Sequence, residues 1–225
     1  MLGIDISSTT VKLLELSRNG DAYRVESYSV APLPPEAVVE KNVNQVDVVG
    51  GLISELVARS KTRAQQAVAA VSGSAVIIKT IAMPAGLSEE DLEAQLTLEA
   101  DQYIPYPLDE VALDFVELGP AMGRDDQVNV LLAACRQETI ESRIDSLEVA
   151  GLTPAIIDVE VFAMERALAL LRSQMPVAAP ETIAMVDIGA SMTTLSVFAG
   201  GESVYTREQL FGGKQLTDEI MNRYD

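Results

Sequence analysis

Histidine is absent from this sequence of 225 residues, and aromatic side chains are few, with four phenylalanines and six tyrosines. Without imidazole the chain cannot use histidine as a general base, and the common types of zinc site are excluded because they need histidine or several cysteines. A single cysteine, Cys135, excludes a disulfide within one chain. It lies in the apolar run 128–135, so we expect a buried side chain and not a nucleophile.

Basic residues are also scarce, since 16 Lys and Arg against 34 Asp and Glu give a formal net charge of −18. Such a surface repels a polyanion, and no cluster of basic residues interrupts it, so we expect no nucleic-acid partner. Long apolar runs of about 18 residues do not occur, and Met1 leads into an apolar strand without a basic flank. We therefore expect a cytoplasmic protein with neither a signal peptide nor a membrane span.

The sequence does contain enough aliphatic residues for a full core, with 48% hydrophobic residues in all, and it contains one motif twice. Residues 2–6 and 11–16 are two apolar segments joined by serines and threonines, a pattern that predicts a β-hairpin. Residues 185–198 repeat this pattern, with Asp187 in the place of Asp5 and Gly189 in the place of Ser7. The chain therefore has two equivalent hairpins.

The hairpin tips offer hydroxyl and backbone N–H groups, which suit phosphate. A single aspartate before serine or threonine is often no more than an Asx turn. Two facing copies, however, can hold the two ends of one polyphosphate, with Asp5 and Asp187 binding a hydrated Mg²⁺ through water. Lys12 adds a point charge for a phosphate, and its alternative is a solvent-facing strand lysine. The residues expected around the phosphates are Asp5, Ser7, Ser8, Thr9, Lys12, Asp187, Gly189, Ser191, Thr193, Gly212 and Gly213.

The remaining pattern predicts further strands and helices between and after the hairpins. In chain order we first expect a strand at 23–30, a helix at 45–61 capped by Asp47, and strands of one sheet at 66–71 and 75–83. A helix from Ser88 to Ile104, strands at 111–118 and 127–136 and a helix ended by Gly151 should follow. After them we expect a strand at 153–159 that resumes the first sheet, a helix at 160–173, a linker at 176–180, a strand at 202–209 and a helix after Gly213. Gly50 and Gly51 each cost the helix at 45–61 about 1 kcal/mol. The block from 74 to 151 is expected to be an insertion with its own small core.

Three segments resemble one protein family: GIDISSTTVKLLEL (3–16), EADQYIPYPLDEVALDF (99–115) and DVEVFAMERALAL (158–170). They resemble the PilM family of type IV pilus assembly proteins, relatives of the division protein FtsA in the actin and Hsp70 ATPase superfamily. The resemblance implies an α/β, actin-like fold of the ribonuclease H type with an inserted α+β subdomain. In the nomenclature of that superfamily, subdomain 1A covers 1–73 and 152–180, the FtsA-like subdomain 1C covers 74–151, and 181–225 begins subdomain 2A. Because the superfamily continues beyond this point, we expect a fragment with a truncated second lobe that is also cut before Met1.

The resemblance also implies ligands and partners. The cofactors would be ATP and Mg²⁺, and Asp158 and Glu160 lie where the superfamily orients the attacking water. The alternative for these two acids is that they complement the positive end of a helix. PilM proteins bind the cytoplasmic N-terminal segment of the membrane protein PilN in a cleft between subdomains 1A and 1C. Tyr103, Ile104 and Tyr106 are the corresponding peptide-binding candidates, and their alternative role is to cap a local core.

Two classes of function follow from the resemblance. The first is a nucleotide-binding scaffold that PilN recruits to the inner-membrane alignment complex of the pilus, with self-association as a further implied contact. The second is a working ATPase or phosphotransferase, or an FtsA-like tether in cell division. Ser7 and Ala190 stand where the superfamily mostly has glycine, which restricts the approach of backbone to phosphate. This departure favours the scaffold, with at most slow ATP hydrolysis, and we expect the full-length protein to bind Mg-ATP more tightly than residues 1–225.

Overall fold

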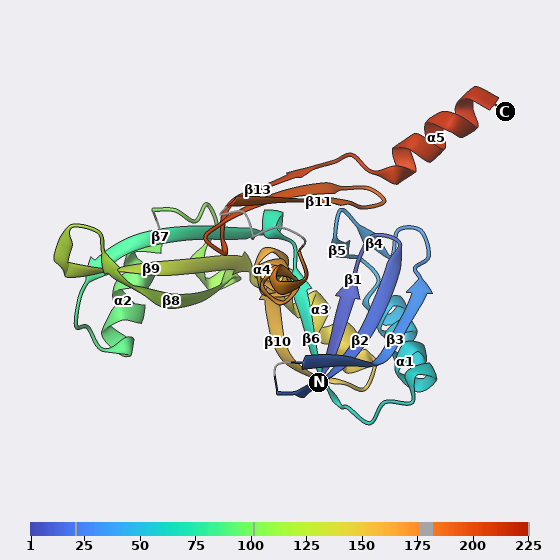
Figure 1. Cartoon of the computed structure of the whole chain (residues 1–225), viewed down its shortest axis with the longest axis horizontal. Helices are drawn as coiled ribbons and strands as arrows, with labels where there is room; N and C mark the ends of the chain where they lie inside the picture. Colours follow the sequence, from blue (N-terminus) through green and yellow to red (C-terminus); the bar gives the residue numbers. More distant parts are fainter. Residues whose placement is uncertain (21, 101, 176–181, 225) are drawn as a thin grey trace. The chain divides into compact units, whose positions relative to one another are not determined.

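The computed structural model describes residues 1–20, 22–100, 102–175 and 182–224 (Figure 1). The chain forms two compact units. The main unit comprises residues 1–74 and 141–225, and the inserted unit comprises residues 75–140. The linker expected at 176–180 lies outside the described residues. Each unit has its own hydrophobic core.

A five-stranded sheet organises the main unit, in the order β10-β6-β1-β2-β3. Its strands are β1 (Leu2–Ile6), β2 (Thr10–Asn19), β3 (Ala22–Pro32), β6 (Gln66–Val71) and β10 (Thr153–Val159). The first three strands form an antiparallel meander, whereas β6 is parallel to both β1 and β10. Side chains alternate across β1, so Leu2, Ile4 and Ile6 are buried while Asp5 is exposed on the other face. The expected third strand and the return of the sheet at 153–159 are confirmed.

Two helices contribute to the main core, α1 (Val46–Ser60) and α3 (Gln137–Val149). Val49, Ile53 and Leu56 are fully buried along one side of α1, at the helical spacing that the sequence predicted. The expected cap is wrong, because Gln45 and not Asp47 is the N-cap residue, and it makes no side-chain cap hydrogen bond. Asp47 lies in the first turn, where its charge complements the positive end of the helix.

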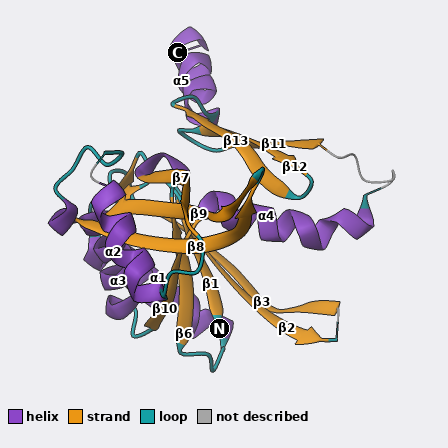
Figure 2. Cartoon of the chain, turned by 90° about the vertical axis from the view of Figure 1, so that its left-hand side faces the viewer, coloured by secondary structure: helices purple, strands orange, loops and turns teal. Residues whose placement is uncertain are grey.

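The second hairpin belongs to a separate sheet of the main unit, in the order β11-β12-β13. The chain enters it after helix α4, and the elements are α4 (Glu160–Leu171), β11 (Thr182–Ile188), β12 (Thr193–Ala199), β13 (Glu202–Gln209) and α5 (Gly213–Tyr224). Helix α5 projects away from this sheet in both ribbon views (Figures 1 and 2). Both hairpins therefore form where the repeated motif predicted them.

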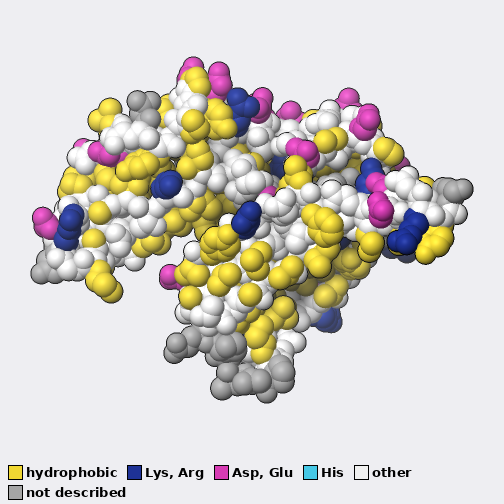
Figure 3. Space-filling model, turned by 90° about the horizontal axis from the view of Figure 1, so that it is seen from above, with side chains coloured by type: hydrophobic (Ala, Val, Ile, Leu, Met, Phe, Trp, Pro, Cys, Tyr) yellow, Lys and Arg dark blue, Asp and Glu magenta, His cyan; other side chains and the backbone are white. Residues whose placement is uncertain are grey.

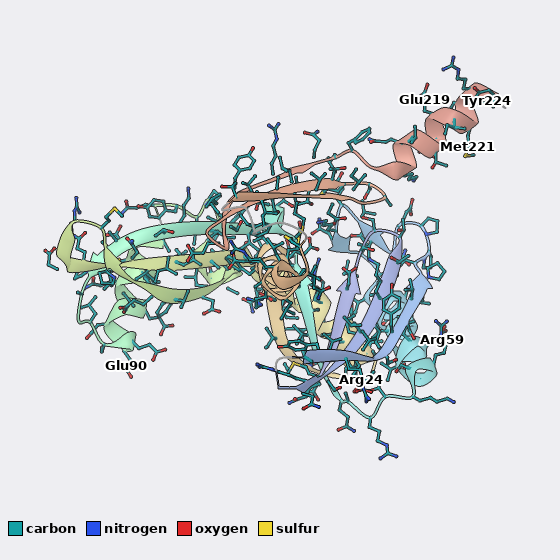
Figure 4. The ribbon with its side chains drawn as sticks, in the orientation of Figure 1. Arg24, Arg59, Glu90, Glu219, Met221 and Tyr224 are labelled. Carbon is teal, nitrogen blue, oxygen red and sulfur yellow. The ribbon has the colours of Figure 1, made fainter. Side chains whose placement is uncertain are left out.

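Helix α5 carries apolar side chains that are exposed, among them Met221 and Tyr224 near its end (Figure 4). Hydrophobic side chains are exposed over much of the face that Figure 3 shows. No helix in the described part of the chain is long and apolar enough to cross a membrane.

Among its described residues the inserted unit contains a three-stranded sheet covered by an α-helix. Its strands β7 (Val76–Pro84), β9 (Arg124–Arg136) and β8 (Val111–Ala121) lie in that order, and its helix is α2 (Glu89–Ala100). Leu92 and Leu96 of α2 pack with Val130 and Leu132 of β9 in a core of its own. Ser88 caps α2 as expected, since its hydroxyl oxygen accepts the N–H of Asp91 at 3.2 Å.

Two expectations about this region differ from the structure. The segments 66–71 and 75–83 form β6 and β7, which belong to different sheets and not to one. The inserted unit ends at residue 140, so most of α3 lies with the main unit, although we expected the insertion to run to 151. The physical reason is that Leu147, Ala150 and Leu152 are buried in the main core.

Candidate functional site

The tip of the first hairpin is closed by its own hydroxyl groups. The backbone N–H of Ser7 donates to the carbonyl oxygen of Thr10 at 3.0 Å, and the Ser7 hydroxyl donates to the same oxygen at 2.9 Å. Residues 7–10 all keep a negative φ, so this tip does not need the glycine that the superfamily mostly has there. Ser7 therefore fits the turn without strain.

The second tip uses glycine for a steric reason. The N–H of Gly189 donates to the carbonyl oxygen of Met192 at 2.9 Å. A Cβ atom at Gly189 would lie 2.8 Å from that same oxygen, which is too close for any other residue. The two tips touch, because the hydroxyl of Ser191 donates to the hydroxyl of Ser8 at 2.8 Å. The two hairpins are therefore in direct contact at their tips.

Asp5 and Lys12 face each other across the first hairpin. They are register partners on β1 and β2, and their side chains form an ion pair with an N to O distance of 2.6 Å. Burial by itself lowers the pKa of Lys12, but the hydrogen bond and charge of Asp5, with smaller contributions from Tyr28 and Asp187, raise it overall. At the equivalent place in the second hairpin stands Thr194, which is buried and uncharged.

A cavity of about 570 Å³ lies between the two tips and helix α4, entirely within the main unit. Most of the residues predicted to surround phosphates line it, together with one of the two predicted catalytic acids. They are Asp5, Ser7, Ser8, Thr9, Lys12, Asp187, Gly189, Ser191 and Glu160. The structure thus brings together residues that are more than 180 positions apart in the chain, such as Ser8 and Ser191.

Three predicted phosphate ligands do not line this cavity. The hydroxyl of Thr193 donates to the carbonyl oxygen of Phe211 at 2.7 Å. The N–H of Gly213 donates to Gly189 at 2.9 Å, and the N–H of Gly212 donates to the side-chain oxygen of Gln215 at 3.1 Å. A Cβ atom at Gly212 would lie 2.5 Å from the carbonyl oxygen of Ala190. In this structure the glycine pair therefore packs on the second hairpin and supports its tip.

The two predicted catalytic acids lie in different environments. Glu160 begins α4 and lines the cavity, where its carboxylate pairs with the ammonium of Lys41 at 2.6 Å. Asp158 does not line the cavity; its carboxylate accepts the N–H of Val159 and pairs with Arg166. Glu160 is therefore the acid that the structure places at the cavity.

Lys41 is the charged residue of the cavity lining that the sequence analysis missed. It lies in the turn between β4 (Val38–Val39) and β5 (Asn42–Val43), with a positive φ of 64°. Its ammonium pairs with Glu160 and, at 3.5 Å, with Glu208 of β13, while its carbonyl oxygen accepts a 2.6 Å hydrogen bond from Arg143. The two acids are 119 and 167 positions away from Lys41. No local pattern in the sequence could have indicated these contacts.

The charges that line the cavity nearly balance. Asp5, Glu160 and Asp187 supply three negative charges, and Lys12 and Lys41 supply two positive charges. The described residues contain no group of three or more acids, cysteines or histidines able to hold a metal ion by themselves. Any divalent cation bound here would therefore need oxygen ligands from water or from a bound phosphate as well.

Comparison with known proteins gives the family of this chain. The family described as type IV pilus assembly protein PilM matches residues 3–225. A solved chain of the PilM-PilN type IV pilus biogenesis complex is similar with 30% identity and a TM-score of 0.81, over 99% of this chain and 65% of that chain.

Two more distant structures share the fold alone. The ethanolamine utilization protein EutJ of Carboxydothermus hydrogenoformans has 16% identity and a TM-score of 0.54, over 99% of this chain and 56% of its own. The cytoplasmic domain of EpsL, an inner membrane component of the type II secretion system of Vibrio cholerae, has 12% identity and a TM-score of 0.55. The match covers 92% of this chain and 70% of that chain. The expected α/β, actin-like fold is confirmed, and the chain belongs to the PilM family of type IV pilus assembly proteins.

Proposed function

We propose that this chain is part of a scaffold of type IV pilus assembly that binds Mg-ATP at the cavity between its two hairpins. The observation that carries the proposal is the direct contact of the two hairpin tips beside a cavity lined by Asp5, Lys12 and Asp187. The hydroxyl oxygens of Ser8 and Ser191 are 2.8 Å apart. Hydroxyl groups and a lysine supply donors for phosphate oxygens, and the two aspartates can hold water molecules of a hydrated cation.

The residues present fit the phosphate and the metal of such a ligand. Ser8, Thr9 and Lys12 would hold phosphate, while Asp5 and Asp187 would hold Mg²⁺ through water. When bound, Mg²⁺ would neutralise phosphate charge beside the three acids of the cavity. Because the charged side chains of the lining are net negative, a bound Mg²⁺ would reduce their repulsion of a polyphosphate.

Binding is better supported than rapid turnover. Asp158 does not line the cavity, and its two oxygens are occupied by the N–H of Val159 and by Arg166, while Glu160 pairs with Lys41 through one carboxylate oxygen. Because an acid that orients water must present a free oxygen to it, Glu160 is the one predicted catalytic acid left for this role. We therefore propose a nucleotide-binding scaffold with at most slow hydrolysis. Phosphate release by the full-length protein no faster than that of its Asp187→Ala variant would agree with this proposal, and much faster release would indicate an ATPase.

The nucleotide site can be tested with two substitutions. Asp5→Ala and Asp187→Ala in the full-length protein should each weaken Mg-ATP binding about tenfold, because each removes one anchor of the metal. Isothermal titration calorimetry measures the affinities, and Asp114→Ala in the inserted unit is an exposed control outside the cavity. Unchanged affinity in both hairpin variants would contradict the proposed site.

We also propose that the inserted unit binds the cytoplasmic N-terminal segment of PilN and that PilN thereby recruits the protein to the inner membrane. Support comes from the similar chain in a PilM-PilN complex and from two half-exposed tyrosines, Tyr103 and Tyr106, with 41% and 39% exposure. Arg136 lies over the ring of Tyr106, 4.7 Å from its centre. Ile104 differs from the tyrosines, because it is 5% exposed and belongs to the core of the inserted unit. It therefore supports this surface from below.

Peptide binding separates these roles. Tyr103→Ala and Tyr106→Ala should stay folded and weaken binding of a synthetic PilN N-terminal peptide about tenfold, since aromatic side chains commonly anchor such interfaces. Fluorescence anisotropy measures the affinity, and circular dichroism checks the fold. Ile104→Ala should instead lower the melting temperature, because it removes a buried side chain. Folded tyrosine variants that bind the peptide as the wild type does would place the peptide elsewhere.

A further inference from the structure

A cluster of charged and polar side chains lies at the wall of the cavity beside α4. Lys41 is at its centre, with its side chain only 14% exposed, and it pairs with Glu160 at 2.6 Å and with Glu208 at 3.5 Å. Glu208 is 7% exposed, and its two carboxylate oxygens also accept the hydroxyl of Ser72 at 2.8 and 3.0 Å. Buried charges of this kind are costly unless they are paired and hydrogen-bonded, so the cluster holds Lys41 in a defined place.

The two acids hold Lys41 unequally. Glu208 is fixed from a second side by Ser72, which is itself 3% exposed and bonded to Ser74. Glu160 lines the cavity, is 26% exposed, and has Lys41 as the partner of its carboxylate in the described contacts. A ligand that enters the cavity therefore meets the contact between Lys41 and Glu160, while Glu208 remains behind it.

We infer that Lys41 is a second phosphate-binding cation of the site and that Glu160 occupies it until a nucleotide competes for its ammonium. This inference rests on the proposed binding of Mg-ATP. A phosphate oxygen and a carboxylate oxygen are equivalent partners for an ammonium group, so one can replace the other. Glu208 keeps one negative partner on Lys41 during the exchange.

Lys41 keeps its positive charge. Burial by itself lowers the pKa of Lys41, but the hydrogen bond and charge of Glu160, together with Glu208, raise it overall. The ammonium is therefore fully protonated at neutral pH and remains a cation for phosphate. The exchange also links α4, which begins at Glu160, and β13, which carries Glu208, to occupation of the cavity.

The exchange predicts that substitutions of Glu160 and of Lys41 change the affinity for Mg-ATP in opposite directions. In the full-length protein, Glu160→Gln should bind Mg-ATP on the order of threefold more tightly, because the competing charge is gone. Removal of the cation should weaken binding about tenfold, as for loss of one charge-assisted hydrogen bond. Lys41→Met alone leaves Glu208 buried without its cation, so the variant to use is the double substitution Lys41→Met with Glu208→Gln. Lys41→Arg keeps a cation at this position and should therefore retain most of the wild-type affinity.

Calorimetry with Mg-ATP tests the inference, with melting temperatures recorded for each variant. Lys79→Met, an exposed lysine of the inserted unit, is the matched control and should bind as the wild type does. A purely structural ion pair would lower the melting temperature in both variants without moving their affinities in opposite directions. A Glu160→Gln variant no tighter than wild type, or a folded double variant of wild-type affinity, would overturn the inference. Absence of Mg-ATP binding by the wild type would overturn the proposed function, and this inference with it.

Discussion

Replacing Arg143 with leucine is expected to lower the free energy of unfolding by about 3 to 5 kcal/mol. Arg143 is 1% exposed, and its guanidinium donates to the carbonyl oxygens of Ala70 and Lys41, each at 2.6 Å. Leucine leaves both carbonyl groups without the donor that the buried guanidinium supplies. Equilibrium unfolding in urea, followed by circular dichroism, measures the change.

A matched substitution separates burial from the loss of an arginine. Arg59 also donates to a backbone carbonyl, that of Val30 at 3.0 Å, but its side chain is exposed on α1 (Figure 4). Arg59→Leu should therefore lower the free energy of unfolding by less than about 1 kcal/mol, since water replaces the lost donor. Equal losses in the two variants would contradict the role assigned to Arg143. Because Arg143 fixes the backbone of Lys41, its loss should also disturb the cavity.

Gly50→Ala is the second substitution with a large expected effect, and it should lower the free energy of unfolding by about 2 to 3 kcal/mol. A Cβ atom at Gly50 would lie 2.5 Å from Cγ1 of Val149 and 2.8 Å from the backbone oxygen of Ser146, both on α3. Rotation of the Val149 side chain could move Cγ1, but its Cβ atom, at 2.6 Å, and the oxygen of Ser146 could move only with α3 and its buried Leu147. This close approach outweighs the gain of about 1 kcal/mol that alanine brings to a helix.

The neighbouring glycine provides the control. A Cβ atom at Gly51 meets nothing within 4 Å, so Gly51→Ala should stabilise the protein by about 0.5 to 1 kcal/mol. Thermal and urea unfolding of the two variants should thus shift in opposite directions. A stabilised Gly50→Ala variant would show that α1 and α3 are not in close contact. The helical penalty expected for both glycines therefore has a structural purpose at Gly50 alone.

Local patterns were sufficient for most of the elements and for much of the site. The hairpins followed from apolar segments around short polar tips, and α1 followed from the spacing of Val49, Ile53 and Leu56. The repeat of Asp5 at Asp187 predicted two equivalent tips, and the structure brings both to one cavity. These features could be predicted because turn chemistry and side-chain periodicity depend on neighbours within a few residues.

Contacts between distant segments required the tertiary structure. Gly212 and Gly213 were reasonable phosphate ligands by composition, but the N–H of Gly213 donates to Gly189 of the second tip and the N–H of Gly212 donates to the side chain of Gln215. The separation of β6 from β7 and the place of α3 likewise depend on which core buries each apolar face, and similar apolar patterns fit either core.

The sequence by itself determined the family, the two hairpins and the acids and lysine at their strands. Only the tertiary structure decided that Lys41 belongs to the cavity and that Arg143 fixes its backbone. The physical reason is that an ion pair forms wherever folding brings opposite charges within a few ångströms, here across 119 and 167 positions of the chain. A lysine carries no local sign of such a partner, whereas a strand or a turn is largely specified by the residues beside it.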